Sequence, residues 1–494
     1  MEQQVYLGVD LGAESGRVMA GIFDGQTVNL VEVHRFPNTP VRVAGSWRWD
    51  VLRLWYEIQC GLKKAGEQFG SRIVSVGVDT WGVDYVPFNK SDEMLGQPVC
   101  YRDHRHDGVM EAAWGRVSRK EIYQRTGLQF LVFNTLYQLI AFQRDQPELV
   151  DLCDRILMMP DCLHWLLCGS RVVEYTNATT TQCVNVETGD WDDDLIAKFG
   201  LPRKMFPKIV SPGTKLGALR EEVAKNAGLS RIDVIAPPTH DTAAAVVGIP
   251  TSSTGQGNWA YISSGTWSLV GVETDRPFVN EQAVKFNVTH EGGVDGTYRL
   301  LKNVMGLWLV QQCKKQFDAD GSDRSYADLV KLAGQAEAYR SLIDPNDGRF
   351  LSPENMVDAI QSFCRDTKQP VPETPGQLIR CCLESLAFKY ADVLKELESL
   401  TGFQVKTLHI VGGGSQNELL NQLTSNACGI AVEAGPTEST VLGNVLIQAR
   451  TRGAIGSLGE IREVIRRSSS MKRFEPMVDQ TTLGAFERWR GLKK

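Results

Sequence analysis

The sequence lacks several features that would place it in a special class of protein. Positive charge is not in excess, because Lys and Arg total 53 against 59 for Asp and Glu, a net charge of −6. The chain therefore has no excess of positive charge that would attract phosphate backbones or anionic lipid, and we expect neither nucleic acid nor membranes as partners. Hydrophobic residues make up 42% and charged residues 23% of the chain, which excludes extended disorder and is typical of a soluble globular protein.

A long apolar run and an export signal are also absent. The longest apolar stretch, residues 128–142, is interrupted by four polar side chains and is too short to span a bilayer. The first residues contain no basic region and lead directly into a predicted strand, which is not typical of a signal peptide. We therefore expect a cytoplasmic protein.

The eleven cysteines do not form a recognisable framework. None belongs to a C-x-x-C pair, so neither a zinc ribbon nor a set of structural disulfides is predicted. In a reducing cytoplasm most of them would be buried thiols. Cys364 with Cys381 or Cys382 is the one pairing close enough in sequence to suggest a local bridge.

The pattern of short β-rich runs alternating with amphipathic stretches predicts an α/β protein. Strands are expected at residues 5–10, 73–78, 260–266 and 407–411. Helices are expected from Val51 after an N-cap at Asp50, after the capping box Ser118-x-x-Glu121, after Asn134, and over residues 304–317 and 375–400.

The chain also predicts two similar halves. Its 494 residues are enough for two large domains or three ordinary ones. A strand followed by a glycine turn occurs at Gly12 and again at Gly265, 253 positions later and about half the chain away. A small polar stretch at residues 251–257 has the composition of a connection. We expect a first domain over residues 1–249 and a second over residues 250–494.

Common nucleotide motifs are missing, but three glycine turns remain. There is no G-x-x-x-x-G-K-[ST], no G-x-G-x-x-G after a strand, and no H-R-D-x-x-x-x-N. The turns lie at residues 12–16, at Gly265-Thr266 and at residues 412–414. Each could cradle phosphate oxygens with its backbone N–H groups, and each could equally be a tight hairpin.

Four carboxylates follow apolar runs, where a buried charge is costly unless it meets a metal, a proton or hydrogen-bond donors. They are Asp10, Asp79, Asp84 and Asp241. Asp241 opens a helix of small residues within Thr239-His240-Asp241-Thr242, so it could face a ligand. The alternative is that Asp241 or Thr239 only caps that helix.

A second possible ligand set is His104-x-His106 between two aspartates. Alternate positions of a strand share a face, so the two histidines could ligate a metal. The alternative is a solvated loop.

Several of these segments resemble the FGGY family of carbohydrate kinases over nearly the whole chain. The matching strings are residues 9–13, the Asp241 segment, residues 264–266 and residues 409–417. The resemblance implies two ribonuclease H-like, actin-like ATPase domains flanking a catalytic cleft. The first domain would hold most of the sugar and the second most of the ATP.

The resemblance also implies roles for individual residues, with ATP as co-substrate and Mg²⁺ as the ion. ATP would be contacted by a first phosphate loop and by three later residues: Ala13, Glu14, Ser15, Gly16 and Arg17, then Thr266, Gln311 and Gly413. The sugar would be contacted by Gly82, His240, Asp241, Thr242 and Asn303. Asp241 would be the general base, and Asp10 would lie near the magnesium ion through water. A phosphoryl transfer needs mainly positioning and charge neutralisation, which this set supplies.

Four longer strings resemble one subfamily, whose acceptor is the C1 hydroxyl of the ketose L-rhamnulose. They are residues 77–84, 174–181, 240–242 and 301–308. The implied products are L-rhamnulose 1-phosphate and ADP, in L-rhamnose catabolism, and no obligate protein partner is expected. One alternative is a kinase for another ketose or polyol, such as fuculose, xylulose or glycerol. Another is a non-catalytic, actin-like binding protein switched by nucleotide. A chaperone of that kind would need a further peptide-binding domain, for which we expect no room.

Overall fold

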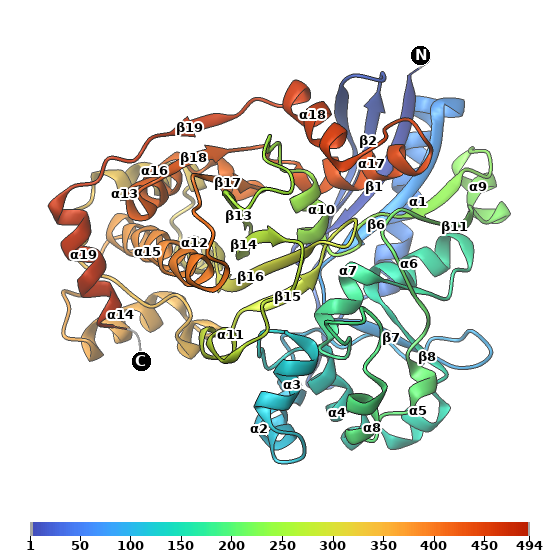
Figure 1. Ribbon diagram of the computed structural model, residues 1–494, viewed down its shortest axis with the longest axis horizontal. Coiled ribbons are helices and arrows are strands. Elements are labelled where there is room, and N and C mark those ends of the chain that lie inside the picture. The colour runs from blue at the N-terminus through green and yellow to red at the C-terminus, as the bar shows by residue number, and fades with distance from the viewer. Residues whose placement is uncertain (1–2, 493–494) are drawn as a thin grey trace. The chain divides into compact units, whose positions relative to one another are not determined.

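The computed structural model describes residues 3–492, which divide into two compact units (Figure 1). Unit 1 contains the chain up to Thr254 together with Glu273–Leu300 and Ser439–Ser469. Unit 2 contains Gly255–Val272, Leu301–Glu438 and the chain from Ser470 onward. Each unit is therefore built from segments that are distant in sequence. The boundary after Ile249 stays a prediction.

Unit 1 is organised around a six-stranded mixed sheet with the order β11-β12-β6-β1-β2-β3. The strand β1 lies at its centre, parallel to β6 and antiparallel to β2. The bounds of these strands are β1 Gln4–Leu11, β2 Ser15–Phe23, β3 Val28–Pro37, β6 Ile73–Thr80, β11 Thr214–Ala218 and β12 Asp233–Ala236. Short strands outside this sheet are β4 Val41–Val43, β5 Ser46–Arg48, β7 Tyr85–Phe88, β8 Arg155–Met158, β9 Val173–Glu174, β10 Ile209–Val210 and β15 Thr289–Gly292.

Two helices of unit 1 begin at predicted caps. Asp50 accepts a hydrogen bond from the backbone N–H of Arg53 and starts α1, and Ser118 accepts one from the backbone N–H of Glu121 and starts α3. The predicted helix after Asn134 is confirmed as α4. The helices are α1 Val51–Phe69, α2 Val109–Trp114, α3 Arg119–Thr126, α4 Thr135–Asp145, α5 Pro147–Leu152, α6 Met159–Cys168, α7 Tyr175–Ala178, α8 Asp193–Lys198, α9 Glu221–Ala227, α10 Asp241–Val247, α11 Glu281–Phe286, α17 Ser439–Thr451 and α18 Leu458–Ser468.

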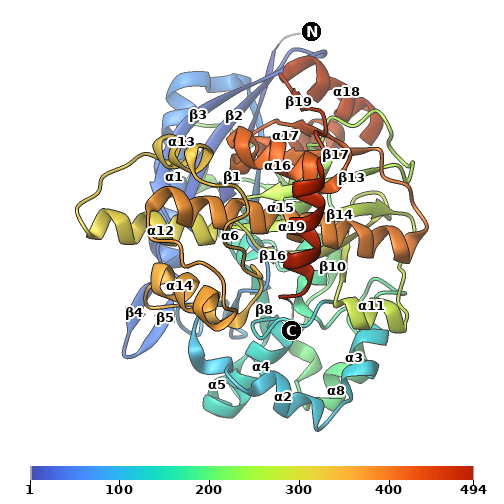
Figure 2. The same cartoon turned by 90° about the vertical axis from the view of Figure 1, so that its left-hand side faces the viewer.

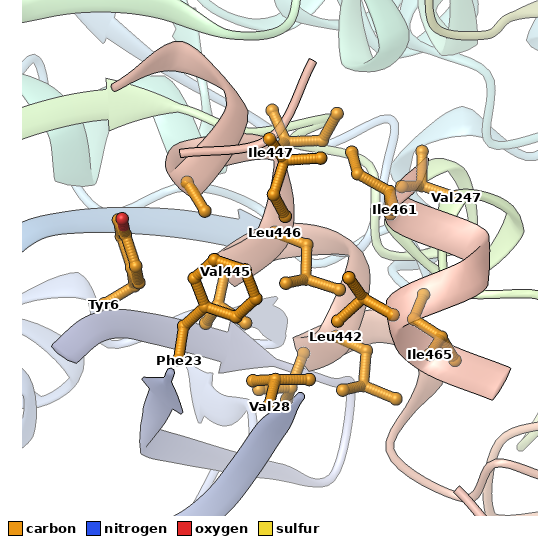
Figure 3. Close-up of a cluster of buried hydrophobic side chains, with 14 of the residues drawn as sticks. Tyr6, Phe23, Val28, Val247, Leu442, Val445, Leu446, Ile447, Ile461 and Ile465 are labelled. Atoms are coloured by element: carbon orange, nitrogen blue, oxygen red, sulfur yellow. The ribbon is translucent and has the colours of Figure 1, made fainter. Parts of the chain in front are cut away.

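Helices cover both faces of the sheet in unit 1. Successive residues of a strand point to opposite faces. Met19 of β2 belongs to a buried cluster with residues of α17 and α18. The adjacent Val18 points to the other face, where a Cβ on Gly61 of α1 would lie 2.3 Å from it. Figure 3 shows Leu442, Val445 and Leu446 of α17 in the cluster. A Cβ on Gly21 would lie 2.8 Å from Val445, so glycine lets α17 lie directly on the strand. The core of unit 1 therefore needs α17, which comes from the last part of the chain.

Unit 2 is organised around strands in the order β16-β14-β13-β17-β18-β19. The strands β13 and β17 are parallel neighbours, and β13 pairs with β14 in an antiparallel hairpin. The strand bounds are β13 Trp259–Ser264, β14 Trp267–Thr274, β16 Tyr298–Met305, β17 Thr407–Val411, β18 Ala431–Ala434 and β19 Lys472–Phe474. The end of β14 and the start of β16, up to Leu300, belong to unit 1. The helices are α12 Trp308–Ala319, α13 Tyr326–Gln335, α14 Met356–Asp366, α15 Pro375–Thr401, α16 Glu418–Cys428 and α19 Gln480–Arg490.

The long helix α15 forms the centre of the helical layer in unit 2 and contacts α12, α13, α16 and α19 (Figure 2). Its first turn has a capping box, in which Thr374 and Gln377 each bind the other's backbone N–H. The prediction of a helix beginning at residue 304 is wrong, because Val304 and Met305 complete the strand β16 and α12 begins at Trp308.

The two sheet-based units confirm the predicted α/β class. All eleven cysteines are free thiols, so the suggested bridge from Cys364 is not formed. Over residues 3–492, no helix combines the length and the apolar character needed to cross a membrane.

Candidate functional site

Three of the predicted carboxylates come together at one edge of the unit 1 sheet. Asp10 and Asp79 are register partners on the parallel strands β1 and β6. Asp241 is the first residue of α10. The loop before it is attached to the end of β6 by a hydrogen bond of 2.9 Å from the backbone N–H of Thr80 to the carbonyl of Thr239. Because the ends of parallel strands meet at the same edge, the fold gathers these acids from three separate segments.

Asp79 is the most deeply buried of the three. Its Oδ2 accepts a hydrogen bond of 2.6 Å from the side-chain amide of Asn444 on α17, while its Oδ1 is buried and has no hydrogen-bond partner among the described residues. Burial, and then the charge of Asp10, raise its pKa well above the usual range, with a further contribution from Asp241. Arg17 pairs with Asp10 and compensates the charge there. Sequence reasoning did not find Asn444, which lies on a helix formed more than 300 residues later.

Asp241 is held at the start of α10 by its own neighbour. Its Oδ1 accepts hydrogen bonds from the backbone N–H of Thr242 at 2.6 Å and from the Thr242 hydroxyl at 3.2 Å. The N-cap position belongs to His240, so the alternative in which Asp241 or Thr239 caps the helix is wrong. The Asp241 side chain keeps 32% of its surface exposed. Burial of the rest raises its pKa, the neighbouring His240 opposes this, and Asp10 adds to the rise. The carboxylate is thus accessible to a ligand and more basic than an ordinary one.

The loop before Asp241 is anchored on a buried carboxylate that sequence reasoning assigned no role. Glu174 accepts hydrogen bonds from the backbone N–H and the hydroxyl of Thr239 at 2.9 and 2.7 Å, and two more from Thr176 at 2.9 and 2.6 Å. The Thr176 hydroxyl in turn accepts the N–H of His240 at 3.2 Å. Burial raises the pKa of Glu174, and the four donors oppose the rise. Glu174 therefore fixes the backbone that presents His240 and Asp241.

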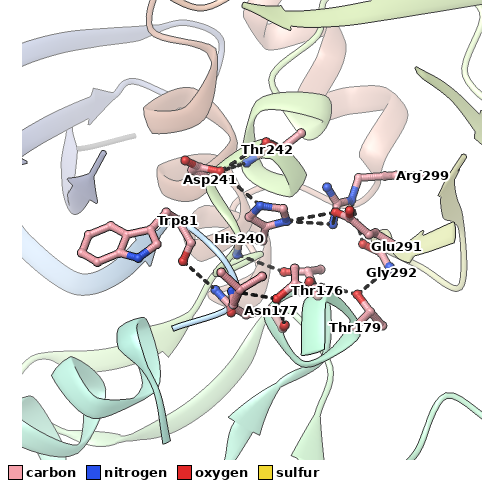
Figure 4. Close-up of polar contacts among 12 residues, drawn as sticks. Trp81, Thr176, Asn177, Thr179, His240, Asp241, Thr242, Glu291, Gly292 and Arg299 are labelled. Carbon is pink, nitrogen blue, oxygen red and sulfur yellow. Dashed lines mark hydrogen bonds and ion pairs between the residues drawn. The ribbon is translucent and has the colours of Figure 1, made fainter. Parts of the chain in front are cut away.

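The His240 side chain lies within a network of charged groups that also includes Glu291 and Arg299 (Figure 4). Its Nε2 is 3.4 Å from Oδ1 of Asp241, and its Nδ1 is 3.2 Å from Oε2 of Glu291 and 3.1 Å from Nη2 of Arg299. Burial alone would raise the pKa of Glu291, but the charge of Arg299, and after it the contact with His240, lower it below its usual value. Sequence reasoning assigned no role to Glu291, which lies in the buried strand β15.

Gly82, the remaining sugar contact predicted in unit 1, lies in a tightly packed loop. A Cβ on Gly82 would be 2.9 Å from the methyl group of Thr180, and the Thr180 hydroxyl accepts the N–H of Val83 at 3.0 Å. The following residue Asp84 is fully buried and accepts hydrogen bonds from the indole N–H groups of Trp49 and Trp81 at 2.6 and 3.0 Å. Burial raises the pKa of Asp84 to about 6. Asp84 thus organises the loop rather than facing a ligand.

The predicted first phosphate loop is the turn between β1 and β2. The N–H of Gly12 donates to the carbonyl of Ser15 at 2.9 Å, and Asn38 braces the turn by donating to the carbonyl of Gly12 at 2.7 Å. Glu14 is exposed at its tip, with Ala13 beside it. Gly16 is buried, and a Cβ there would lie 2.3 Å from the ring of Phe36, so packing alone requires glycine at this position. Arg17 follows as the partner of Asp10.

The three residues predicted to contact ATP from unit 2 lie around the ends of β13 and β17. Thr266 is in the hairpin turn after β13, and its carbonyl accepts the N–H of Trp308 at the start of α12, the helix that carries Gln311. The carbonyl of Ser264 would be 2.9 Å from a Cβ on Gly412, and no atom of residues 3–492 lies within 4 Å of a Cβ on Gly413. Gly413 is exposed, and Oε1 of Gln311 is buried with no hydrogen-bond partner in the described chain.

Asn303 is the one predicted sugar contact that lies in unit 2. It belongs to β16, and its carbonyl accepts a hydrogen bond of 3.4 Å from the side-chain amide of Asn346. Gly82, His240, Asp241 and Thr242 are all in unit 1, so a shared sugar site that includes Asn303 stays a prediction.

A metal site at the predicted histidine pair is not formed. His104 and His106 lie in a short 3-10 helix, where His104 is exposed and pairs with Asp107 while His106 is buried. Within residues 3–492, no group of three His, Cys, Asp or Glu side chains is arranged to hold a metal ion directly. The carboxylate oxygens of Asp10 and Asp79 are the donors that Mg²⁺ prefers, and this ion commonly keeps several of its waters. The donor set therefore fits a magnesium ion that is bound largely through water.

Comparison with solved structures identifies the fold. The chain aligns with the xylulose kinase from Lactobacillus acidophilus at a TM-score of 0.81 and 17% identity, covering 99% of this chain and 96% of that one. It aligns with the glycerol kinase from Plasmodium falciparum, solved with ADP, at a TM-score of 0.80 and 15% identity, covering 99% and 97%. The fold is thus that of two-domain carbohydrate kinases, as the sequence predicted.

The family follows from sequence comparison. Residues 5–248 match the N-terminal domain and residues 260–452 the C-terminal domain of the FGGY family of carbohydrate kinases. The chain belongs to this family and is a sugar kinase, a transferase whose family uses ATP as co-substrate. Its relatives include proteins named Rhamnulokinase from Bacteroides thetaiotaomicron, 45% identical over 96% of both chains, and from Pectobacterium atrosepticum, 44% identical over 99% of this chain and 96% of that one. A third, from Oceanobacillus iheyensis, is 42% identical over 94% and 97%.

Proposed function

We propose that the protein transfers the γ-phosphoryl group of ATP to the C1 hydroxyl of L-rhamnulose, which gives L-rhamnulose 1-phosphate and ADP. The observation that carries this proposal is the set of relatives named Rhamnulokinase, which are 42–45% identical over nearly the whole chain. The likeness to xylulose and glycerol kinases concerns the fold alone, because identity there is 15–17%.

In this proposal Asp241 is the general base. Its carboxylate is partly accessible, and its Oδ1 is oriented by two hydrogen bonds from Thr242. Burial raises its pKa, which makes it a better proton acceptor than an ordinary aspartate while it is ionised. As the C1 oxygen attacks phosphorus, its proton would pass to the carboxylate of Asp241. His240, Thr242, Gly82 and Asn303 would hold the sugar.

The nucleotide would be held by backbone groups more than by side chains. The exposed turn at Ala13, Glu14 and Ser15 offers N–H groups for phosphate oxygens, and Arg17 adds a positive charge behind it. In unit 2, Thr266 and Gln311 would contact ATP, and the open space over Gly413 leaves room for a flat base. Asp10, with the unpartnered oxygen of Asp79 beside it, would hold magnesium through water. The ion would neutralise charge on the phosphoryl group.

A panel of sugars tests the proposal. The purified protein is incubated with ATP, Mg²⁺ and, separately, L-rhamnulose, L-fuculose, D-xylulose and glycerol, and ADP release is followed. We expect kcat/KM for L-rhamnulose to exceed that for each other acceptor by at least about 100-fold, a factor that differences in pocket packing alone can supply. Highest activity with another acceptor would leave the chain a sugar kinase and reject L-rhamnulose as its substrate.

A further inference from the structure

Arg299 of β16 is a charged residue with no exposed surface. Its Nε donates to the carbonyl of Gly292 at 2.8 Å, and its Nη2 lies 3.1 Å from Oε2 of Glu291 and 3.1 Å from Nδ1 of His240 (Figure 4). Burying a guanidinium is costly unless it is paired and hydrogen-bonded, and here one carboxylate and one carbonyl provide the compensation. A buried arginine against the side chain beside Asp241 therefore requires an explanation beyond packing.

Two partners compete for Nδ1 of His240. Glu291 could accept a hydrogen bond only if Nδ1 carried a proton, whereas Arg299 can donate only if Nδ1 is unprotonated. Among the described residues, Arg299 Nη2 and His240 Nδ1 meet the geometry of a hydrogen bond. Oε2 of Glu291 contacts both groups as an ion-pair partner, but it has no directed hydrogen bond in the described chain. The arrangement thus favours donation from Arg299 to His240.

The state of Nδ1 decides what His240 presents to Asp241. If Nδ1 accepts from Arg299, a neutral ring carries its proton on Nε2. Nε2 is 3.4 Å from Oδ1 of Asp241, so its N–H is a donor directed toward the carboxylate and toward any hydroxyl bound beside it. In the other neutral tautomer, the lone pair on Nε2 would face the Asp241 carboxylate, and the proton on Nδ1 would oppose the N–H donor of Arg299.

We propose that Arg299, with Glu291 as its counter-ion, is a positioning residue that keeps the proton of His240 on Nε2 and so aims this N–H at Asp241. Its kinetic consequence rests on the proposed role of Asp241 as the base. Lysine could not replace Arg299, because a single ammonium group cannot donate to the Gly292 carbonyl and to His240 from two separate nitrogens.

The first experiment reads the tautomer directly and needs no activity. The full-length protein is labelled with ¹⁵N-histidine, and long-range ¹H–¹⁵N correlations separate the two neutral tautomers and the charged ring. His240→Gln assigns the signal. We expect wild-type His240 in the Nε2–H form, and a mixture of tautomers in Arg299→Met and Arg299→Lys. Arg450→Met is the matched control, since it removes an arginine that pairs with Asp295 at the surface of the same unit.

The second experiment measures the kinetic effect. With the acceptor that gives the highest activity, kcat should fall at least about 10-fold in Arg299→Met and Arg299→Lys, the scale of outer partners that orient a functional histidine. KM for ATP should not change, and Arg450→Met should behave as wild type. Circular dichroism and thermal unfolding check that each variant is folded.

Wild-type His240 with its proton on Nδ1, or with both nitrogens protonated, overturns the proposal even if Arg299→Met does not fold. An unchanged tautomer and kcat in a folded Arg299→Lys overturn it as well. The proposed function fails in a different way, through the lack of ADP release from wild-type protein with L-rhamnulose. In that case the tautomer measurement still stands.

Discussion

Asp241→Asn is the most direct perturbation of the proposed chemistry, because it removes the charge and keeps the size of the side chain. An asparagine carbonyl can accept the two hydrogen bonds that Thr242 now donates to Oδ1. The variant loses the favourable interaction of a negative charge with the first turn of α10, about 0.3 to 1 kcal/mol. It also loses the repulsion from Asp10 and Asp79, which acts in the opposite sense. The free energy of unfolding should therefore change by no more than about 1 kcal/mol.

The effect on rate should be much larger. A positioned general base contributes about 10²- to 10⁴-fold, and at 1.36 kcal/mol for each tenfold this is about 2.7 to 5.4 kcal/mol of transition-state stabilisation. We expect kcat to fall by that factor while KM for ATP is unchanged, because Asp241 is not among the proposed nucleotide contacts. The assay is ADP release at saturating sugar and ATP, with urea unfolding of the same preparations in parallel.

A matched control is available in Asp193, which is also the first residue of a helix, α8, but is exposed. Asp193→Asn should retain wild-type kcat. A folded Asp241→Asn with kcat within about threefold of wild type would remove Asp241 from the chemistry. An equal loss in both variants would point instead to a general effect of helix N-terminal charge.

Three further predictions concern other parts of the molecule. Asp79→Asn should raise the urea midpoint near pH 8 without Mg²⁺ or nucleotide, because the raised pKa of Asp79 means that its ionised form lowers the stability of the wild type. The gain over wild type should shrink toward about pH 4, where Asp79 is protonated, and a gain that does not change with pH would contradict the raised pKa. Gly413→Val should raise KM for ATP and leave KM for the sugar unchanged, with normal stability since nothing lies within 4 Å of the new Cβ; unchanged constants would mean that this glycine serves only the turn. Gly443→Ala would place a Cβ 1.9 Å from the carbonyl oxygen of Ala244, so it should lower the free energy of unfolding by about 1–3 kcal/mol. Its control is Gly484→Ala, at a helical position with open space around the new Cβ, which should not lower the free energy of unfolding.

Local signals in the sequence predicted elements well where those signals act within a few residues. The cap at Asp50 and the strand at residues 407–411 are observed as predicted. The helix predicted from Val304 begins instead at Trp308, because periodicity alone does not separate the end of a buried strand from the start of a helix. In the structure Gly306 lies against Ser268, where no side chain would fit, and this contact could not be read from the sequence.

The candidate site also has a part that could be predicted from the sequence and a part that could not. Asp241 could be predicted because an acid before a run of small residues is conspicuous in the sequence. Its surroundings could not, because Glu174, Glu291 and Arg299 reach it from segments that only the tertiary fold brings together. Asn444, the partner of Asp79, comes from still farther along the chain. Hydrogen-bond partners at this sequence separation leave no local pattern, and no periodicity could have indicated them.

The division of unit 1 into three segments has a consequence for biosynthesis. A ribosome that has completed the six-stranded sheet has not yet made α17 or α18, so Tyr6, Phe23 and Val28 lack most of the partners in their cluster until Ser439–Ser469 has emerged (Figure 3). Almost the whole of unit 2 must therefore be synthesised before unit 1 can close its core. During that interval the nascent chain exposes an apolar sheet face, which makes chaperone binding and translation speed more important for this protein than for one whose domains follow each other in sequence.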